Sequence, residues 1–270
     1  QYFFPEHGDE PNLLEKALRF ASNVAANENA NQQSLFGGTA SVTLAEPIIP
    51  ACEQWSLIHK LKKEKEVVGM YLSGHPLDTY KLEFQYFVNS EIATVNDKKN
   101  NEISIAGIVV DSYEKVSQKN NKPYGGFTIE DYSGQLRIMM WSEEYLKYRH
   151  LLSNGQMLYV KGRMKPSFKD QNQYDFSVQS IFLLADVREK FVKSVHVELN
   201  ADKINKSFIQ QFSQFVNTNK GAFDLKLNLY DELLKYKVTA HSRSYKINLD
   251  NSVIKELDSM GVSFKINSQT

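Results

Sequence analysis

The chain has 270 residues, enough for two domains, and 41% of them are hydrophobic, an ordinary value for packed globular structure. Its 32 basic and 32 acidic residues cancel, which excludes attraction of nucleic acid by an overall field, so any such site must be a local patch. With a single cysteine, Cys52, the chain cannot form an internal disulfide, and its cysteine and histidine residues are not spaced as zinc ligands are. It also has no apolar run long enough to span a bilayer. We expect a cytoplasmic protein.

The first predicted element is a helix that begins after an acidic, proline-containing start at residues 9–11. Its apolar residues recur at helical spacing: Leu13, Leu14, Ala17, Leu18, Ala21, Val24 and Ala25. The stretch 27–38, rich in Asn, Gln and Gly, then predicts an exposed linker. Because residues 1–10 resemble the tail of an earlier element, we expect a fragment of a longer protein.

A short peptide inside this linker combines a glutamine with two large apolar side chains. It reads Gln32-Gln33-Ser34-Leu35-Phe36. Because the linker offers nothing for Leu35 and Phe36 to pack against, the pattern predicts that they enter a partner's pocket while a polar group fixes the register. The candidate partner-binding residues are Gln32, Ser34, Leu35 and Phe36.

A second helix is predicted from about Trp55 to Tyr71, and Gly74 before Pro76 predicts its end. The residues at its end, 64–78 (EKEVVGMYLSGHPLD), resemble a signature of the bacterial replicative DNA polymerase III alpha subunit family, between its helix-hairpin-helix region and its OB domain. His75 lies in this turn without a metal-ligand partner nearby in the sequence, so we expect a structural role for it.

From Glu102 the hydrophobic period changes to that of strands. Five strands are predicted, at 103–111, 124–131, 136–141, 157–166 and 174–184, with one helix at 143–152. This order predicts a five-stranded OB-fold β-barrel, whose binding face lies on strands two and three and is flanked by two loops. The pair Gly125 and Gly126 predicts a strand bulge.

The OB region carries basic residues and aromatic platforms, the two ingredients of a site for single-stranded DNA. The candidate DNA-binding residues are Lys115, Lys119, Lys122, Tyr124, Phe127, Arg137, Met139, Trp141, Arg163, Lys165, Phe168, Lys169 and Tyr174. We expect Arg137, Met139 and Trp141 to face outward from their strand. Nearby acids dilute the charge: Glu114, Glu130, Asp131, Asp170 and Asp175. We therefore expect the OB region to bind single-stranded DNA weakly. The alternative, that this is an ordinary solvated surface with no DNA-binding role, stays open.

Residues 188–270 show the order strand, helix, strand, strand, helix, strand, which predicts a ferredoxin-like or related split unit. The aromatic residues Phe208, Phe212 and Phe215 follow core spacing, so we expect them in the interior and not on a docking surface.

No catalytic constellation is expected in this chain. Polymerisation with two metal ions needs clustered carboxylates, and there is no Asp-x-Asp. The pairs Glu64 with Glu66 and Glu256 with Asp258 lie on predicted helices, where charge pairing on a solvated face explains them better. We expect no cofactor here; the resemblance implies magnesium only for the parent polymerase, a DNA-directed nucleotidyltransferase.

The chain is thus predicted to be a multidomain α+β protein in four parts. They are the end of a helical region with the linker (1–38), a helical connector (39–98), an OB-fold domain (99–187) and a small α+β domain (188–270). The resemblance implies that the peptide binds the sliding clamp (beta subunit), that the OB domain contacts single-stranded template DNA, and that the last domain binds the clamp loader tau subunit. Two alternatives stay open: a standalone OB-fold RNA-binding module of the aminoacyl-tRNA synthetase anticodon-binding type, and an enzyme with an unrecognised site.

Overall fold

The structure is a computed structural model of the chain. It describes residues 12–33, 45–49, 55–98, 101–118, 121–167, 174–231 and 235–268. The chain divides into two units, Gln1–His75 and Pro76–Thr270, which are described separately below.

The first unit contains two helices, α1 (Leu13–Gln33) and α2 (Leu57–Val68). The Asn12 side chain begins α1 by accepting a hydrogen bond from the backbone N–H of Glu15 at 2.9 Å. The prediction that the helix gives way to a linker at residue 27 is wrong, because α1 continues to Gln33. Its last turns contain alanine and glutamine, which favour helix, together with three asparagines, which made the stretch look like a linker. Gln32 thus belongs to the last turn of α1, while Ser34, Leu35 and Phe36 lie outside the described residues.

Helix α2 ends earlier than the sequence predicts. Its last residue is Val68, and Gly69 adopts the left-handed region with a φ of 84° while its N–H donates to the carbonyl oxygen of Lys65 at 2.9 Å. Gly69, and not Gly74, therefore ends the helix, because it is the first glycine that can take the left-handed cap.

The signature segment after Gly69 folds back on α2. The Glu64 carboxylate accepts hydrogen bonds from the backbone N–H groups of Leu72 at 3.0 Å and Ser73 at 2.9 Å. These bonds lower the pKa of Glu64, the largest contribution coming from the Ser73 hydroxyl. The ring of His75 lies edge-on to Tyr71, with 4.9 Å between centroids. The signature thus forms a local structure in which His75 packs against an aromatic ring.

The second unit begins with a helical connector of three short pieces, η1 (Pro76–Tyr80), α3 (Lys81–Phe87) and η2 (Ile92–Asp97). Leu77, Leu82 and Phe87 of the connector are buried in the same hydrophobic core as residues of the C-terminal sheet. The connector is therefore part of the packing of this unit.

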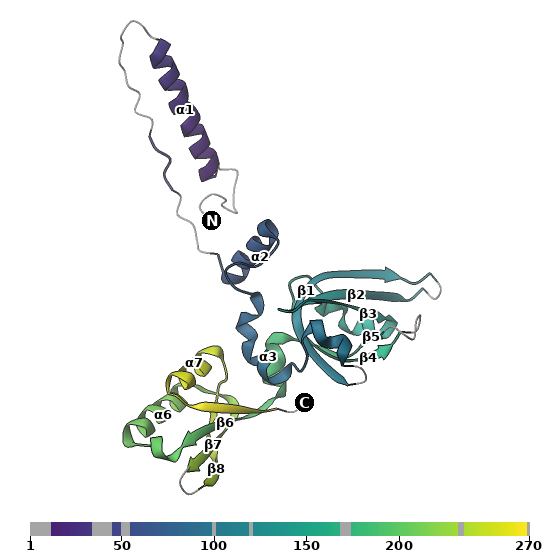
Figure 1. The fold of residues 1–270 in the computed structure, drawn as a ribbon, viewed down its shortest axis with the longest axis vertical. Coiled ribbons are helices and arrows are strands. Elements are labelled where there is room, and N and C mark those ends of the chain that lie inside the picture. Colours follow the sequence, from purple (N-terminus) through teal and green to yellow (C-terminus); the bar gives the residue numbers. More distant parts are fainter. Residues whose placement is uncertain are drawn as a thin grey trace. The chain divides into compact units, whose positions relative to one another are not determined.

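Five antiparallel strands follow, with a helix between the third and the fourth (Figure 1). They are β1 (Glu102–Val116), β2 (Pro123–Glu130), β3 (Gln135–Trp141), β4 (Met157–Pro166) and β5 (Tyr174–Leu183), with α4 (Ser142–Tyr148) and η3 (Arg149–Leu151) after β3. The sheet order is β3-β2-β1-β4-β5, and the edge strands β3 and β5 contact each other. The predicted sequence of strands and helix is confirmed, and the sheet curls around its core.

Strand β1 belongs to both halves of this sheet. Residues up to Ile108 pair with β4, and residues from Ile108 pair with β2. A register shift between Val109 and Asp111 lets the strand bend from one partner to the other. The strand therefore continues to Val116, five residues beyond its predicted end.

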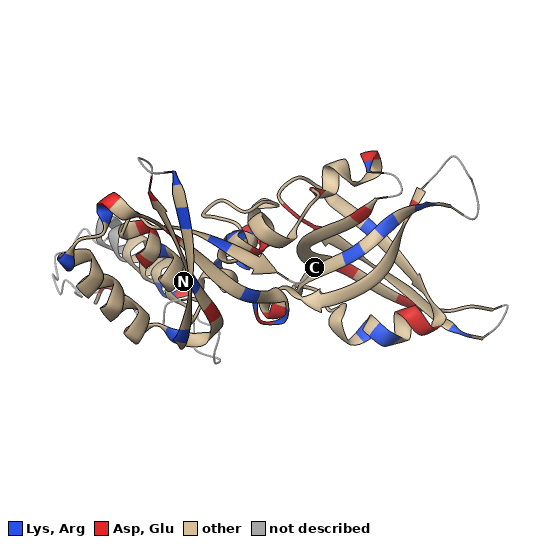
Figure 2. Ribbon diagram, turned by 90° about the horizontal axis from the view of Figure 1, so that it is seen from below, with Lys and Arg blue, Asp and Glu red and all other residues tan. Residues whose placement is uncertain are grey.

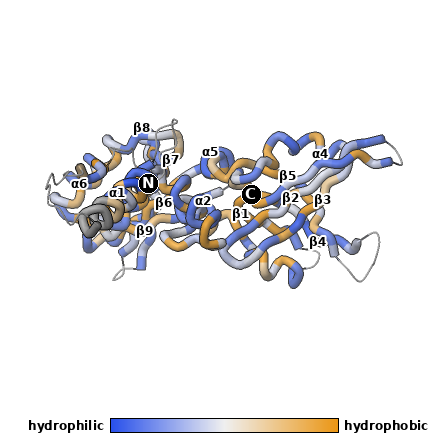
Figure 3. Tube along the Cα trace, turned by 90° about the horizontal axis from the view of Figure 1, so that it is seen from above, coloured by the Kyte–Doolittle hydropathy of each residue, from blue (hydrophilic) through white to orange (hydrophobic). Residues whose placement is uncertain are grey.

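Hydrophobic and hydrophilic residues both occur along these strands (Figure 3), alternation in burial is clearest at residues 137–141 of β3, and the buried apolar residues fill one interior. The predicted bulge at Gly125 and Gly126 is wrong, because both glycines keep the regular register with β1 and β3. A Cβ atom on Gly125 would lie 2.3 Å from the ring of Tyr145, and one on Gly126 would lie 2.5 Å from the carbonyl oxygen of Ile138. The glycines are required by close packing in a regular strand.

The C-terminal part of this unit is a four-stranded sheet with two helices. After η4 (Leu184–Asp186) and α5 (Val187–Phe191) come β6 (Val192–Asn200), η5 (Ala201–Lys203), α6 (Lys206–Thr218), β7 (Lys220–Asp231), β8 (Tyr236–Ile247), α7 (Asn251–Ser259) and β9 (Ser263–Ser268). The predicted β-α-β-β-α-β order is confirmed. The split arrangement is wrong: the sheet order is β8-β7-β6-β9, so the parallel strands β6 and β7 are direct neighbours.

Helices α6 and α7 cover one face of this sheet (Figure 1). Phe212 and Phe215 are buried, and Phe208 packs against the same core, so the prediction that these aromatic residues are interior is confirmed. The helix-facing strand residues are apolar, among them Val195, Val197 and Leu225, whereas their neighbours on the other face are mostly polar.

One ion-pair network joins the connector to the C-terminal sheet. Arg188 of α5 donates to both carboxylate oxygens of Glu83 on α3, to the carbonyl oxygen of Leu249 at 2.7 Å and to Oδ1 of Asn251 at 2.7 Å. Asn251 in turn donates to the carbonyl oxygen of Thr79 at 2.8 Å. Glu83 is 1% exposed, so this charge is buried and compensated.

Candidate nucleic-acid interface

The outer face of β1, β2 and β3 carries three rows of paired residues. The rows are Lys115, Tyr124 and Trp141; Tyr113, Gly126 and Met139; and Asp111, Thr128 and Arg137. We call this surface the three-row face. Arg137, Met139 and Trp141 are exposed, while their neighbours Ile138 and Met140 are buried, so the predicted outward direction is confirmed. The alternation of the strand places one basic, one flexible and one aromatic side chain on the same surface.

The first row contains a stacked aromatic pair. The rings of Tyr124 and Trp141 lie 4.8 Å apart with an interplanar angle of 21°. Because the two residues face each other directly across β2 and β3, the stack needs no distortion of the sheet. Trp141 remains 55% exposed, so part of its ring stays open to solvent.

Tyr113 in the second row lies close to two cations, one from each neighbouring row. The guanidinium carbon of Arg137 lies 4.8 Å from the centroid of Tyr113, and Nζ of Lys115 lies 5.9 Å from it. Tyr113 occupies the space above Gly126, where a Cβ atom would come within 2.9 Å of its ring and hydroxyl. Sequence reasoning missed Tyr113 because it ended strand β1 at Asp111. The alternation of Tyr113 and Lys115 beyond that point was the available signal.

Beside the first row lies an open hollow of ≈ 610 Å³. It is lined by Lys115, Val116, Ser117, Gln118, Tyr124 and Trp141. The stacked rings form one of its walls, and Lys115 adds a positive charge. This combination suits a base that stacks while its phosphate meets a cation.

Two residues that were predicted to bind DNA pack against the hydrophobic core of the OB region instead. Phe127 is 1% exposed in the core of the OB region, because it points inward between the outward Gly126 and Thr128, so its assignment to the DNA-binding face is wrong. Tyr174 is half-buried and packs against the same core. The remaining first-loop residue, Lys122, is exposed.

The predicted cluster around the second loop is only partly described. Lys165 is exposed and lies near Glu144, three residues after Trp141. Burial raises the pKa of the Glu144 carboxyl, and the positive charge of Lys165 partly offsets this rise. Arg163 lies 3.8 Å from Glu102 across β4 and β1, so it is drawn to an acid. Lys119, Phe168 and Lys169 lie outside the described residues.

The acids near the face do not dilute its charge equally. Asp131 is 7% exposed and builds the turn after β2, where it accepts hydrogen bonds from the N–H groups of Ser133 at 2.7 Å and Gly134 at 3.0 Å. Glu114 accepts a hydrogen bond from the Tyr145 hydroxyl at 2.9 Å. Burial and this bond raise the pKa of Tyr145. Basic and acidic positions are interspersed on the strands of both sheets (Figure 2).

Within the described ranges, no three His, Cys, Asp or Glu side chains gather so that they could hold a metal ion. None of the helices in the described part of the chain is both long and apolar enough to cross a membrane.

Comparison with protein families gives two matches. Residues 103–184 match the OB-fold nucleic acid binding domain, and residues 195–267 match the C-terminal domain of the DNA polymerase III alpha subunit. These matches assign the two sheets to two different domain types.

Curated relatives cover most of the chain. DNA polymerase III alpha subunits of Vibrio cholerae and Haemophilus influenzae are 26% and 28% identical to it over 220 residues, which is 80% of this chain and 19% of each relative. The alpha subunit of Buchnera aphidicola is 29% identical over 155 residues, 56% of this chain and 13% of the relative. The chain therefore spans less than a fifth of the length of these relatives.

Two solved structures have some likeness to the chain. The SSB domain of a Synechococcus protein is 14% identical, covers 30% of this chain and 92% of its own, and has a TM-score of 0.26. Asparaginyl-tRNA synthetase from Pyrococcus horikoshii is 15% identical, covers 36% of this chain and 22% of its own, and has a TM-score of 0.28. Scores this low carry no argument. The family matches and the curated relatives confirm the predicted resemblance: this chain is similar to the C-terminal region of bacterial DNA polymerase III alpha subunits, in which an OB-fold nucleic acid binding domain precedes the last domain.

Proposed function

We propose that this chain acts in DNA replication as the non-catalytic C-terminal part of a DNA polymerase III alpha subunit, and that its three-row face binds single-stranded template DNA. The observation that carries the DNA-binding proposal is the stack of Tyr124 with the exposed Trp141, which has Lys115 in the same row and Arg137 farther along the same face. Stacking of a base on an aromatic side chain contributes about 1–3 kcal/mol, and the cations add a salt-dependent attraction to phosphate.

A fluorescence anisotropy titration with a labelled oligothymidylate tests this proposal. Trp141→Ala is expected to lower the affinity about 5- to 150-fold, the equivalent of about 1–3 kcal/mol. The matched control is Tyr236→Ala, which removes an aromatic side chain that is 70% exposed on β8. An unchanged affinity of Trp141→Ala, with the far-UV circular dichroism spectrum intact, would refute the assignment of the face.

Competition between single-stranded DNA and tRNA separates this proposal from a standalone RNA-binding module. We expect the oligothymidylate to displace labelled DNA at lower concentration than tRNA does. Preferential displacement by tRNA would favour the anticodon-binding alternative. The match of residues 195–267 to the last domain of the polymerase family supports the DNA proposal, because a standalone module has no use for it.

The peptide Gln32 to Phe36 is proposed to tether the polymerase to the sliding clamp. Leu35 and Phe36 would fill an apolar pocket of the clamp, and Gln32 would hydrogen-bond at its rim. Micromolar affinity suffices, because a ring already on DNA raises the effective concentration towards the millimolar range. Deleting these five residues should abolish binding to the clamp in calorimetry. Deleting Asn27 to Asn31 instead leaves the motif intact and should preserve most of the binding enthalpy.

The last domain is proposed to bind the clamp loader tau subunit in the cytoplasm, and the longer protein is proposed to be the magnesium-dependent polymerase. Calorimetry of this chain with tau tests the first point, and absence of heat at micromolar concentrations would overturn it. A nucleotide-incorporation assay on this chain alone is expected to be blank.

A further inference from the structure

The C-terminal sheet has a second face, opposite the one that α6 and α7 cover. Its residues alternate with the buried apolar positions that pack against α6 and α7. They lie in three rows across the strands: Lys265, His196, Lys226 and His241; Ser263, Glu198, Asn228 and Thr239; and Asn200, Tyr230 and Lys237. We call this surface the open sheet face.

Positive charge dominates the first row of the open sheet face. All of its four members are lysine or histidine, and adjacent strands lie about 4.8 Å apart, so the row spans about 14 Å. The pKa of His196 is lowered, first by partial burial and then by Lys226, His241 and Lys237, while Glu198 opposes them. The field that the imidazole senses is therefore positive on balance.

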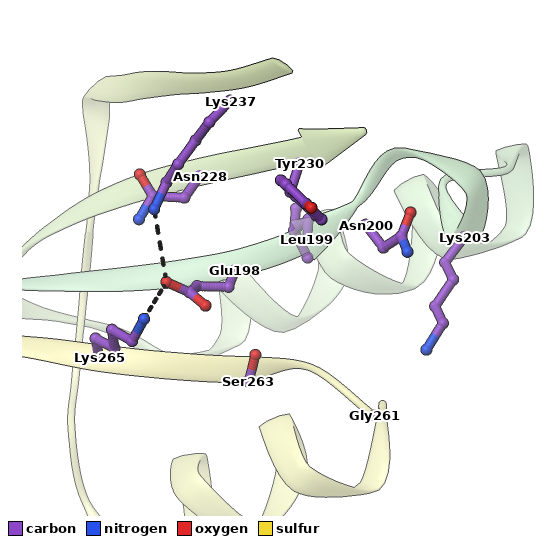
Figure 4. Close-up of a pocket in the computed structure, with 10 residues that line it drawn as sticks. All are labelled: Glu198, Leu199, Asn200, Lys203, Asn228, Tyr230, Lys237, Gly261, Ser263 and Lys265. Atoms are coloured by element: carbon purple, nitrogen blue, oxygen red, sulfur yellow. Dashed lines mark hydrogen bonds and ion pairs between the residues drawn. The ribbon is translucent and has the colours of Figure 1, made fainter. Parts of the chain in front are cut away.

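Glu198 orders two of the lysines and cancels only one of their two charges. Nζ of Lys265 lies 2.8 Å and Nζ of Lys237 lies 3.9 Å from the same carboxylate oxygen, Oε1 (Figure 4). These two lysines hold the pKa of Glu198 below its usual range, with the hydrogen bond from Lys265 as the largest cause. One carboxylate thus holds two ammonium groups on the same side of the sheet, and Lys226 adds a third cation.

A hollow of ≈ 470 Å³ opens at the end of these strands. Figure 4 shows that Lys237, Asn228, Glu198 and Lys265 come from four different strands and line it together. Tyr230, 43% exposed, and Asn200 also line it. The hollow therefore combines an exposed aromatic ring with cations.

We propose that the open sheet face binds the backbone of a single nucleic-acid strand, with Lys226, Lys237 and Lys265 contacting phosphates and Tyr230 stacking on a base in the hollow. A single strand suits the surface because its flexible backbone can bring successive phosphates to Lys265, Lys226 and Lys237, which lie on three different strands of one face. An acidic protein segment would use the lysines but would leave the exposed ring of Tyr230 without a role. This surface is separate from the three-row face, because it belongs to the other sheet.

The salt dependence of binding tests the proposal on the full chain. A labelled 30-residue oligothymidylate is titrated between 50 and 200 mM NaCl with the triple variant Lys226→Gln, Lys237→Gln, Lys265→Gln. Each lost phosphate contact reduces the slope of log K against log salt by about 0.7 for a single strand, so the slope should fall by about 2. The matched control neutralises three lysines at exposed positions outside the hollow and the rows, Lys206→Gln, Lys220→Gln, Lys255→Gln, and should leave the slope unchanged.

A second measurement does not depend on the three-row face. Photo-crosslinking of an oligonucleotide that contains 5-iododeoxyuridine should label Tyr230, both in the unmodified chain and in Trp141→Ala. If the triple variant misfolds by circular dichroism, Lys237→Gln alone, whose side chain is 55% exposed, replaces it and should lower the slope by about 0.7. An unchanged slope without a crosslink overturns the proposal. Loss of polyglutamate binding in the triple variant, with DNA binding unchanged, overturns it in favour of an acidic protein partner.

Discussion

Replacing Arg188 by methionine removes the centre of the network that joins the connector to the C-terminal sheet. The side chain of Arg188 is 16% exposed and that of Glu83 is 2% exposed. Methionine keeps much of the length and apolar contact of the arginine stem but supplies no donor. The variant therefore leaves a carboxylate buried beside α5 without its guanidinium, and the carbonyl oxygen of Leu249 loses a hydrogen bond of 2.7 Å.

The structure sets the expected magnitude. Removing one partner of a buried ion pair costs about 3–5 kcal/mol, because the remaining charge stays desolvated. For a unit of this size each kcal/mol lowers Tm by about 2–4 °C, so a fall of about 6–20 °C is expected. The double variant Glu83→Gln, Arg188→Met should recover part of the loss, since no charge is then left buried.

Thermal and urea unfolding followed by far-UV circular dichroism measures these differences. The matched control is Lys190→Met on the same helix, whose ammonium lies 3.4 Å from Asp186 with both side chains nearly half exposed, and it should cost less than about 1 kcal/mol. Affinity for oligothymidylate at the three-row face should change little in the folded variant. A loss below about 1 kcal/mol for Arg188→Met, or no recovery in the double variant, would contradict the reasoning.

Three further changes have defined outcomes. Gly125→Ala places a Cβ atom 2.3 Å from the ring of Tyr145 and should lower the free energy of unfolding by about 1–3 kcal/mol in urea titration, whereas Gly134→Ala meets nothing within 4 Å and should be nearly neutral. Tyr145→Phe removes the bond to Glu114 and should cost about 1 kcal/mol; an equal effect in the Glu114→Ala background, which has no side-chain acceptor, would argue against that bond. Asp250→Ala removes the cap of α7 and should cost about 0.5–2 kcal/mol. Hydrogen bonds from Ser252 and from the Val253 N–H lower the pKa of Asp250 from 3.8. The stability that the cap contributes is therefore fully present above a pH of about 4 and is lost as the pH falls through the lowered pKa. If the stability difference between the unmodified chain and Asp250→Ala did not depend on pH, the cap would be excluded as its source.

The alternation of apolar residues was sufficient to predict which side chains of β3 face outward. Arg137, Met139 and Trp141 could be placed outward because Ile138 and Met140 between them are hydrophobic, and the structure buries those two. Alternation depends only on the two-residue period of a strand, so it is readable without tertiary information.

Features that depend on neighbours distant in the sequence could not be read in this way. Two adjacent glycines, Gly125 and Gly126, suggest a bulge in the sequence. The structure shows instead that glycine is needed there because the rings of Tyr145 and Tyr113 leave no room for a Cβ atom. Phe127 was assigned to the DNA-binding face because aromatic residues suit that surface, although its position in the strand points it inward. The adjacency of β6 and β7 likewise follows from long-range pairing that the order of elements does not determine.

The site itself was predicted in part for the same reason. Tyr113 was missed because its strand bends at Val109 and continues, a bend set by the change of partner from β4 to β2. The stack of Tyr124 with Trp141 required the register of β2 against β3, which no local pattern gives. Tyr124 and Trp141 were therefore predicted as individual residues, but their contact was not.

Strand β8 has consequences for handling the isolated chain. It is 12 residues long and lies at the edge of its sheet, so one row of its backbone N–H and C=O groups has no neighbouring strand in the sheet. Such a strand is a template for β-pairing between molecules, and exposed Tyr236 and Val238 increase the tendency to aggregate. Lys237 and Lys246 counter it by charge repulsion between two copies. Concentrated stocks should therefore self-associate more readily at high ionic strength, where this repulsion is screened.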